Sequence, residues 1–333
     1  MKLIWIAALS FPVLVLIHAQ NAQQQPSDSS VQKIKFVTVD RDVKLEVLDW
    51  GGTGRPVVLL AGLGVTAHAF DTFAPKLASS YHVYGITRRG FGGSSIPKPD
   101  GNNYSADRLG DDVLAVLDSL KIEKPVLAGH SMAGEELSSI GSRHPEKIAG
   151  LVYLDAAYGY AYFNDKSAHG DPTADAADVR SDLDRLFSPV SLDERVRLAH
   201  HLLETSLPRL ERDIQEGLKL SQGAPNTTPP DSPTMQAGIA FRKGVQIYSA
   251  VKCPVLAIYA VPHSIPESME KDPARRAQII ADDLVTTSAQ IDAFQAGNPS
   301  ARVVRIPNAN HLVYQSNEAD VVREMNAFIA GLP

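Results

Sequence analysis

Short apolar runs alternate with amphipathic segments along most of the chain. A run such as 56–60 is apolar at every position, which is typical of a strand buried on both faces of a sheet. The pattern predicts strands at 33–39, 43–50, 56–60, 81–87, 125–127, 148–154, 253–259 and 302–306, and helices at 67–77, 105–120, 132–143, 178–186, 192–203, 207–220, 273–295 and 317–329. Strands and helices that alternate at this spacing indicate an α/β fold with a mostly parallel sheet and helices on both faces.

The alternation stops between about residues 158 and 250, where the pattern becomes helical and polar, and it resumes afterwards. We therefore expect a core formed by residues 33–157 and 251–333, interrupted by a helical cap insertion at 158–250. A proline-rich stretch at 224–230 is expected to be an irregular loop within the insertion.

The first 19 residues have the pattern of a secretory signal peptide. Lys2 precedes a short apolar stretch that ends in the small residue Ala19, and a polar linker follows at 20–32. Cleavage after Ala22 and an uncleaved anchor are the alternatives, but the apolar stretch is short for a span of about 20 residues. We expect an exported protein, periplasmic or secreted, without a stable membrane anchor once the signal is removed.

Charge and cysteine content narrow the possible functions. The 333 residues carry a formal net charge of −6, which argues against a nucleic-acid partner because little would neutralise phosphates. Cys253 is the only cysteine, so an intramolecular disulfide is excluded. It lies in an apolar run and is expected to be a small core residue. The composition does not indicate the oligomeric state.

Candidate chemistry begins at Gly129-His130-Ser131-Met132-Ala133-Gly134, where a predicted strand turns into a predicted helix. Such a turn holds Ser131 on a sharp bend with its hydroxyl projecting from the strand end. Small residues are needed on both sides because strand and helix approach closely. The backbone N–H of Met132 points to where an anion would bind. The alternative is an ordinary buried turn in which the serine caps the helix.

Two further loops are expected at the same edge of the sheet. Residues 56–60 run into Ala61-Gly62-Leu63-Gly64, so the N–H of Leu63 is expected to join that of Met132 around an oxyanion, unless this is an ordinary strand–helix turn. His311 follows the last predicted strand, where it can accept the proton of Ser131.

The other histidines, among them the loop residue His263, receive no role. None of the ten has a metal-ligand spacing, so no metal site is expected.

A carboxylate is needed to orient the imidazole of His311. Asp155 directly follows the predicted strand 148–154, and this position favours it. Glu267 and Asp272, which follow the predicted strand 253–259 at a greater distance, are the alternatives. Asp155 has an alternative role of its own, the capping of the first segment of the insertion.

Four segments together resemble the α/β-hydrolase superfamily over about residues 33–331: Ala61–Gly64, Arg89-Gly90-Phe91-Gly92-Gly93-Ser94, Gly129–Gly134 and Asn308-Ala309-Asn310-His311. The resemblance implies the α/β-hydrolase fold, a Ser–acid–His triad, an oxyanion hole and no cofactor. Matched by motif, it implies Ser131 as nucleophile, His311 as base, and Leu63 and Met132 as oxyanion donors.

The chain departs from the family pattern at four places. Ala133 replaces a glycine, Ala61 replaces the histidine before the oxyanion glycine, and Thr87 replaces an aspartate. The family usually places its acid after the next-to-last strand, where this chain has Ala260-Val261-Pro262. Some members carry the acid one strand earlier, which is where Asp155 falls.

The expected function is hydrolysis of a small ester or related acyl substrate through an acyl-enzyme. A serine at the bend disfavours the family's dehalogenases and epoxide hydrolases, which use aspartate there. Carbon–carbon bond hydrolases, cofactor-free haloperoxidases and lyases keep the serine and are alternatives, as is a non-catalytic binding protein. Tyr158 and Tyr160 are candidates for lining the substrate pocket, with packing of the cap as their alternative role.

Overall fold

The computed structural model describes residues 32–99, 102–163, 171–221 and 231–333. The expected signal peptide, nearly all of the linker and the proline-rich loop lie outside these residues. Within them, no helix is long and apolar enough to cross a membrane.

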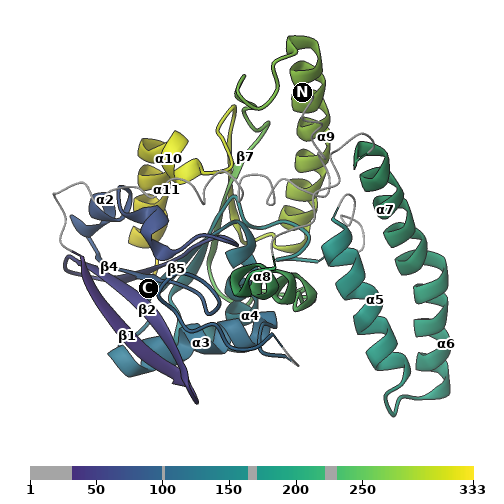
Figure 1. Cartoon of the computed structure of the whole chain (residues 1–333), viewed down its shortest axis with the longest axis horizontal. Coiled ribbons are helices and arrows are strands. Elements are labelled where there is room, and N and C mark those ends of the chain that lie inside the picture. The colour runs from purple at the N-terminus through teal and green to yellow at the C-terminus, as the bar shows by residue number, and fades with distance from the viewer. Residues whose placement is uncertain (1–31, 100–101, 164–170, 222–230) are drawn as a thin grey trace.

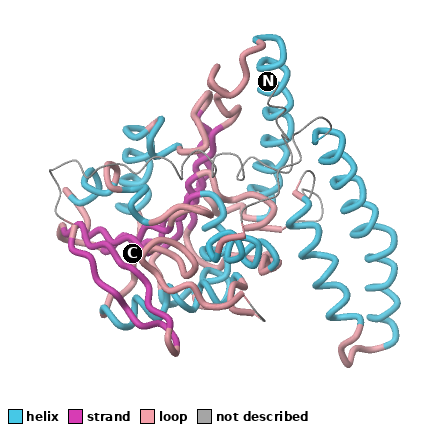
Figure 2. The backbone as a smooth tube through the Cα atoms, in the orientation of Figure 1, coloured by secondary structure: helices cyan, strands magenta, loops and turns pink. Residues whose placement is uncertain are grey.

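The core is one sheet of eight strands, with spatial order β1-β2-β4-β3-β5-β6-β7-β8 (Figures 1 and 2). The first two strands pair antiparallel, β2 pairs antiparallel with β4, and all other pairs are parallel. The strands are β1 (Lys33–Asp40), β2 (Val43–Gly51), β3 (Pro56–Leu60), β4 (His82–Ile86), β5 (Val126–His130), β6 (Gly150–Leu154), β7 (Val255–Ala260) and β8 (Arg302–Ile306). The mostly parallel sheet predicted from the apolar runs is confirmed.

Both faces of the central strands are buried, which explains why β3, β6 and β7 are apolar at nearly every position. In β3, Val58 and Leu60 belong to one hydrophobic cluster, and Val57 and Leu59 belong to a second cluster on the other face. The first cluster packs against α3 (Ala106–Leu120), α4 (Gly134–Arg143), α8 (Pro233–Lys243) and α9 (Pro273–Gly297). The second packs against α2 (Ala74–Ala78), α10 (Val313–Ser316) and α11 (Glu318–Ala330).

Helices α5 (Pro172–Leu186) to α8 lie between β6 and β7 in the chain and form the helical insertion (Figure 1). Helix α6 (Leu192–His201), a π-helical turn at Leu202–Ser206 and α7 (Leu207–Ser221) follow one another without a break and pack beside α5. The buried guanidinium of Arg209 on α7 joins this helix to α5. It donates to Asp175 at 2.7 Å and also pairs with Asp178.

Some local predictions differ from the structure. The short helices α8 and α10 were not predicted. The helix expected at 67–77 is split into a 3-10 turn at Ala67–Phe70 and α2, which begins afresh with Pro75 in its first turn. Proline is favoured there because the first turn of a helix leaves backbone N–H groups unpaired.

Candidate active site

Ser131 lies at the bend between β5 and α4. Its backbone has φ +53°, in the left-handed region that a non-glycine residue adopts only when the surrounding structure holds it there. Its exposed fraction is 4%, and a 3-10 turn at Ser131–Ala133 leads into α4. A Cβ on Gly129 would lie 3.0 Å from Leu137 and 3.1 Å from Ala133, so the predicted need for small residues has a steric basis.

Replacement of Gly134 by alanine is expected to disrupt the start of α4. A Cβ there would lie 2.1 Å from the carbonyl oxygen of Ala156, a backbone atom in the loop that follows Asp155. Because neither backbone can move without shifting the site, we expect Gly134→Ala to lower the free energy of unfolding by about 2–4 kcal/mol. Urea denaturation measures this change.

Gly238 on α8 is the matched control, because a Cβ there meets nothing within 4 Å. Gly238→Ala is expected to leave stability unchanged or to raise it by up to about 1 kcal/mol. Equal destabilisation by the two substitutions would contradict the steric explanation.

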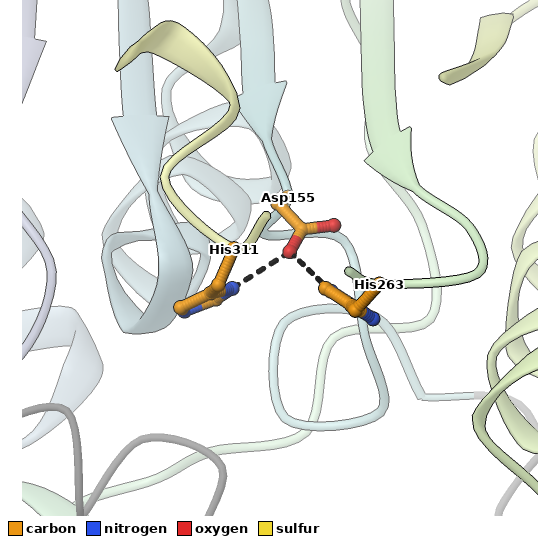
Figure 3. Close-up of side chains that lie close together, drawn as sticks. All are labelled: Asp155, His263 and His311. Carbon is orange, nitrogen blue, oxygen red and sulfur yellow. Dashed lines mark hydrogen bonds and ion pairs between the residues drawn. The ribbon is translucent and has the colours of Figure 1, made fainter. Parts of the chain in front are cut away.

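Asp155 directly follows β6 and is fully buried, with φ +50°. Its Oδ2 accepts a hydrogen bond from Nδ1 of His311 at 2.6 Å (Figure 3). Its Oδ1 accepts from the hydroxyl of Tyr158 at 2.5 Å and from the backbone N–H of Ala260 at 3.0 Å. Burial alone would raise the pKa of Asp155, but His263 and His311 hold it well below its usual range. The carboxylate is therefore ionised.

The two alternative acids, Asp272 and Glu267, are exposed to solvent, whereas Asp155 is buried. Asp272 is exposed and caps α9, where its side chain accepts from the N–H of Ala274 at 3.0 Å. Glu267 is exposed in the loop before α9. Neither has a hydrogen bond to His311 among those observed in the described residues, whereas Asp155 does.

His311 lies on the loop between β8 and α10, beside the bend. Its ring packs on that of His130, with ring centroids 4.6 Å apart, and Nε2 of His130 donates to the carbonyl of His311 at 2.9 Å. Burial, assisted by the neighbouring His311, lowers the pKa of His130 to about 3, so His130 is neutral. Since His130 directly precedes Ser131, this contact ties the loop of His311 to the bend.

The loop that carries Leu63 lies against the same bend. A Cβ on Gly62 would be 3.1 Å from the Cβ of Ser131, so this close approach requires glycine. The guanidinium of Arg88 donates to the carbonyls of Ala61 at 2.9 Å and Gly62 at 3.2 Å. It also forms a buried ion pair with Glu136 of α4. Arg88 thus joins the loop to the helix after Ser131. Leu63 and Met132, the expected oxyanion donors, are both buried.

Tyr158 and Tyr160, the expected pocket residues, follow Asp155 closely. The hydroxyl of Tyr158 is engaged by the carboxylate of Asp155, and its ring packs edge-on against Tyr259. Tyr160 is 9% exposed, and its backbone N–H donates to Asp171 at 3.0 Å. A role of Tyr158 and Tyr160 in lining the substrate pocket stays a prediction, with packing as its alternative.

His263, for which the sequence pattern predicts no role, contacts Asp155. It follows β7, and its Nε2 lies 2.8 Å from Oδ2 of Asp155 (Figure 3). The rule that led to His311, which is to examine the residues that follow each parallel strand, would also have found His263. Its second partner, Asp283 on α9, lies 20 residues further along the chain and carries no local sequence signal.

Among the residues that the structure describes, two groups have the composition of metal-binding sites. In the first, His263 and His311 both lie at hydrogen-bond distance, 2.8 and 2.6 Å, from the same oxygen of Asp155, as proton donors do. In the second, Asp178, Asp182 and His201 surround the hydroxyl of Ser206, which lies 2.8, 3.0 and 3.3 Å from their respective polar atoms. Hydrogen bonding accounts for both arrangements.

Comparisons with known proteins place these features in context. Residues 55–317 match the family model described as the alpha/beta hydrolase fold. The chain is 36% identical over 109 residues to 2-hydroxymuconate semialdehyde hydrolase of Pseudomonas sp. (strain CF600), and 33% identical over 117 residues to fluoroacetate dehalogenase of Burkholderia sp.. These alignments cover 32% and 34% of this chain and 38% of each relative, so the chain spans less than half of the length of either.

A solved structure extends the likeness to most of the chain. Bromoperoxidase from Bacillus anthracis superposes with a TM-score of 0.56 over 90% of this chain and 100% of that chain, at 18% identity. At this identity the likeness concerns the fold alone.

Proposed function

The chain belongs to the α/β-hydrolase fold family, and from this premise we propose that it is a serine hydrolase that cleaves a small ester or related acyl substrate. The observation that carries the proposal is the hydrogen bond of 2.6 Å between Asp155 and His311, formed beside the strained bend that holds Ser131. This combination supplies a nucleophile, a base and an orienting carboxylate at one edge of the sheet.

In the first half of the reaction, Ser131 Oγ attacks the acyl carbon while His311 accepts its proton. Nδ1 of His311 is bonded to Asp155, so Nε2 is the ring nitrogen that would receive the proton. The negative charge of Asp155 stabilises the imidazolium that forms. His311 then gives the proton to the leaving alcohol, and the acyl group remains on Ser131.

In the second half, water is deprotonated by His311 and attacks the acyl-enzyme, which releases the acid and restores Ser131. The N–H groups of Leu63 and Met132 are the proposed donors to both tetrahedral intermediates. Each well-placed donor of this kind lowers the barrier by about 3 kcal/mol. The contact between the loop of Gly62 and Ser131 supports this assignment.

The serine at the bend also limits which of the relatives' reactions this chain can be proposed to catalyse. The family's dehalogenases use an aspartate as nucleophile, so the likeness to fluoroacetate dehalogenase does not bring that reaction to this chain. Cys253 offers no alternative nucleophile, because burial raises its pKa to about 12. Carbon–carbon bond hydrolysis by the same triad, which the family resemblance also allows, is the second candidate, and the likeness to 2-hydroxymuconate semialdehyde hydrolase supports a hydrolase in general.

A fluorophosphonate probe tests the proposal directly. The folded protein should be labelled, and peptide mapping should place the label on Ser131, because only an activated serine reacts rapidly with such a probe. Ser131→Ala should abolish labelling. Ser142→Ala is the matched control on the same helix, since that hydroxyl donates to the carbonyl of Ala250. Folded protein that stays unlabelled, or a label elsewhere, would refute the serine mechanism.

A panel of p-nitrophenyl esters of increasing acyl length then separates the two candidates. Turnover of these esters at rates that depend on Ser131 supports carboxylester hydrolysis. Labelling of Ser131 without turnover of any ester in the panel would favour the carbon–carbon bond hydrolase.

A further inference from the structure

A second histidine is bound to the carboxylate that serves His311. Nε2 of His263 lies 2.8 Å from Oδ2 of Asp155, the same oxygen that accepts from His311 at 2.6 Å. On the other side of its ring, Nδ1 of His263 lies 3.0 and 3.1 Å from the two carboxylate oxygens of Asp283. The imidazole of His263 therefore bridges two carboxylates, and its exposed fraction is 5%.

This geometry favours a positive charge on His263. A neutral imidazole has one N–H and can donate to only one carboxylate, which would leave its other nitrogen lone pair facing an anion. Both nitrogens donate only in the imidazolium. Burial by itself would lower the pKa of His263, but Asp155 and Asp283 outweigh burial and raise it to about 10. The ring is thus charged across the neutral pH range.

Asp283 is held in place to make this contact. Its Oδ2 accepts from the backbone N–H of His263 at 2.7 Å, and its Oδ1 accepts from the hydroxyl of Thr287, one turn along α9, at 3.1 Å. Helix α9 therefore supports the loop after β7 through a carboxylate that is only 12% exposed. Hydrogen bonds from the surrounding fold therefore hold in place the chain of contacts from Asp283 through His263 to Asp155.

The positive charge of His263 affects how readily His311 is protonated. The charged and titratable groups that face it are Asp155 from β6, Asp283 from α9 and His311, whose ring centroid is 6.1 Å away. Tyr158 adds a neutral hydroxyl on the other oxygen of Asp155. A positive charge at His263 opposes a second positive charge on His311, and it shares the carboxylate oxygen that would stabilise one.

We propose that His263, anchored by Asp283, is a positioning residue of the triad. It fixes Oδ2 of Asp155 for the hydrogen bond to His311, and it partly neutralises that carboxylate. His311 then remains an unprotonated base at lower pH than an isolated Asp–His pair would allow. The inference rests on the proposed serine hydrolase function, in which His311 must be neutral to accept the proton of Ser131.

The test is the pH dependence of fluorophosphonate labelling of Ser131 between pH 5 and 9 in wild type and His263→Gln. Glutamine can still donate to Asp155 but carries no charge. Protonation of His311 then becomes more favourable, so the midpoint of labelling should move to higher pH by about 1–2 units. Well below the midpoint the rate should fall by up to about 10- to 100-fold, while at pH 9 it falls less. A purely structural role would lower the rate at all pH values without moving the midpoint.

His82→Gln is the matched control, because His82 also donates to a carboxylate, Asp49 at 2.9 Å, but lies on β4 at a distance from the triad. It should leave the midpoint unchanged. Asp283→Asn provides a second variant that keeps His263 but removes one of its two counter-charges. His263 stays paired with Asp155 and keeps its charge, but a nearby negative charge is lost, so the midpoint should move to lower pH, opposite to His263→Gln and by less. A purely structural role would not move it, so this variant carries the test if His263→Gln does not fold.

A measurement that does not depend on any reaction at Ser131 separates this inference from the proposed function. In protein with ¹³C-labelled histidine rings, the NMR signal of His311 should titrate at higher pH in His263→Gln than in wild type. Absence of labelling in wild type would refute the serine mechanism, while the NMR shift would still support the role of His263 on the triad. Unchanged midpoints by both measurements in folded variants would overturn the inference.

Discussion

Replacement of His311 by alanine is expected to lower kcat/KM for ester hydrolysis by roughly 10⁴- to 10⁶-fold. Without the imidazole, the neighbouring His130 is unsuited to replace it as base, because His130 donates to the carbonyl of His311 and has a pKa of about 3. Residual turnover would come from binding and the oxyanion donors alone. The measurement is steady-state hydrolysis of a p-nitrophenyl ester, with fluorophosphonate labelling as a second assay.

His82→Ala is the appropriate control, since it removes another half-buried histidine that is paired with a carboxylate, Asp49. It should keep activity within about threefold, because surface pairs contribute little to a distant site. Activity of His311→Ala within tenfold of wild type would contradict the role of His311 as base.

Asp155→Asn is expected to lower kcat/KM by about 10³- to 10⁴-fold near neutral pH. The amide nearly matches the carboxylate in shape, and asparagine tolerates the φ of +50° at this position. The loss therefore comes from charge and hydrogen bonding. An amide cannot stabilise the imidazolium of His311, and an NH₂ group at the Oδ2 position would force the wrong tautomer on the ring. The same ester assay measures the effect.

Glu267→Gln and Asp272→Asn are the controls for this substitution, because they neutralise the two acids that the sequence left as alternatives. Both are exposed, and Asp272 serves as the cap of α9. Each should retain activity within about twofold, and Asp272→Asn should cost little stability because asparagine also caps helices. Near-normal turnover by Asp155→Asn together with a large loss in either control would show that the acid is wrongly assigned.

The fold class could be predicted from the sequence because it depends on local patterns. Strands buried on both faces are apolar throughout, and the chain shows such runs at β3, β6 and β7 close to their observed bounds. The least predictable elements were short or interrupted ones, such as α10 and the split helix near Pro75. Their ends depend on contacts with distant parts of the chain.

Much of the candidate site was also accessible from the sequence. The bend at Ser131 is defined by its neighbouring small residues, and parallel strands bring the residues that follow them to one edge of the sheet. That rule predicted the meeting of His311 and Asp155, and the structure brings them to 2.6 Å. Whether Ser131, His311 and Asp155 act as a triad is a prediction for the experiments above.

The sequence by itself determined the sheet, the helical insertion and the sharp bend at Ser131, because each depends on residues close together in the chain. Only the tertiary structure decided which acid reaches His311, since Asp155 and the alternatives are all more than 35 residues from it in the chain. It also revealed that His263 and Asp283 complete the surroundings of Asp155. The physical reason is that a hydrogen bond depends on the relative placement of strand ends and α9 to within about 1 Å, which no local pattern encodes.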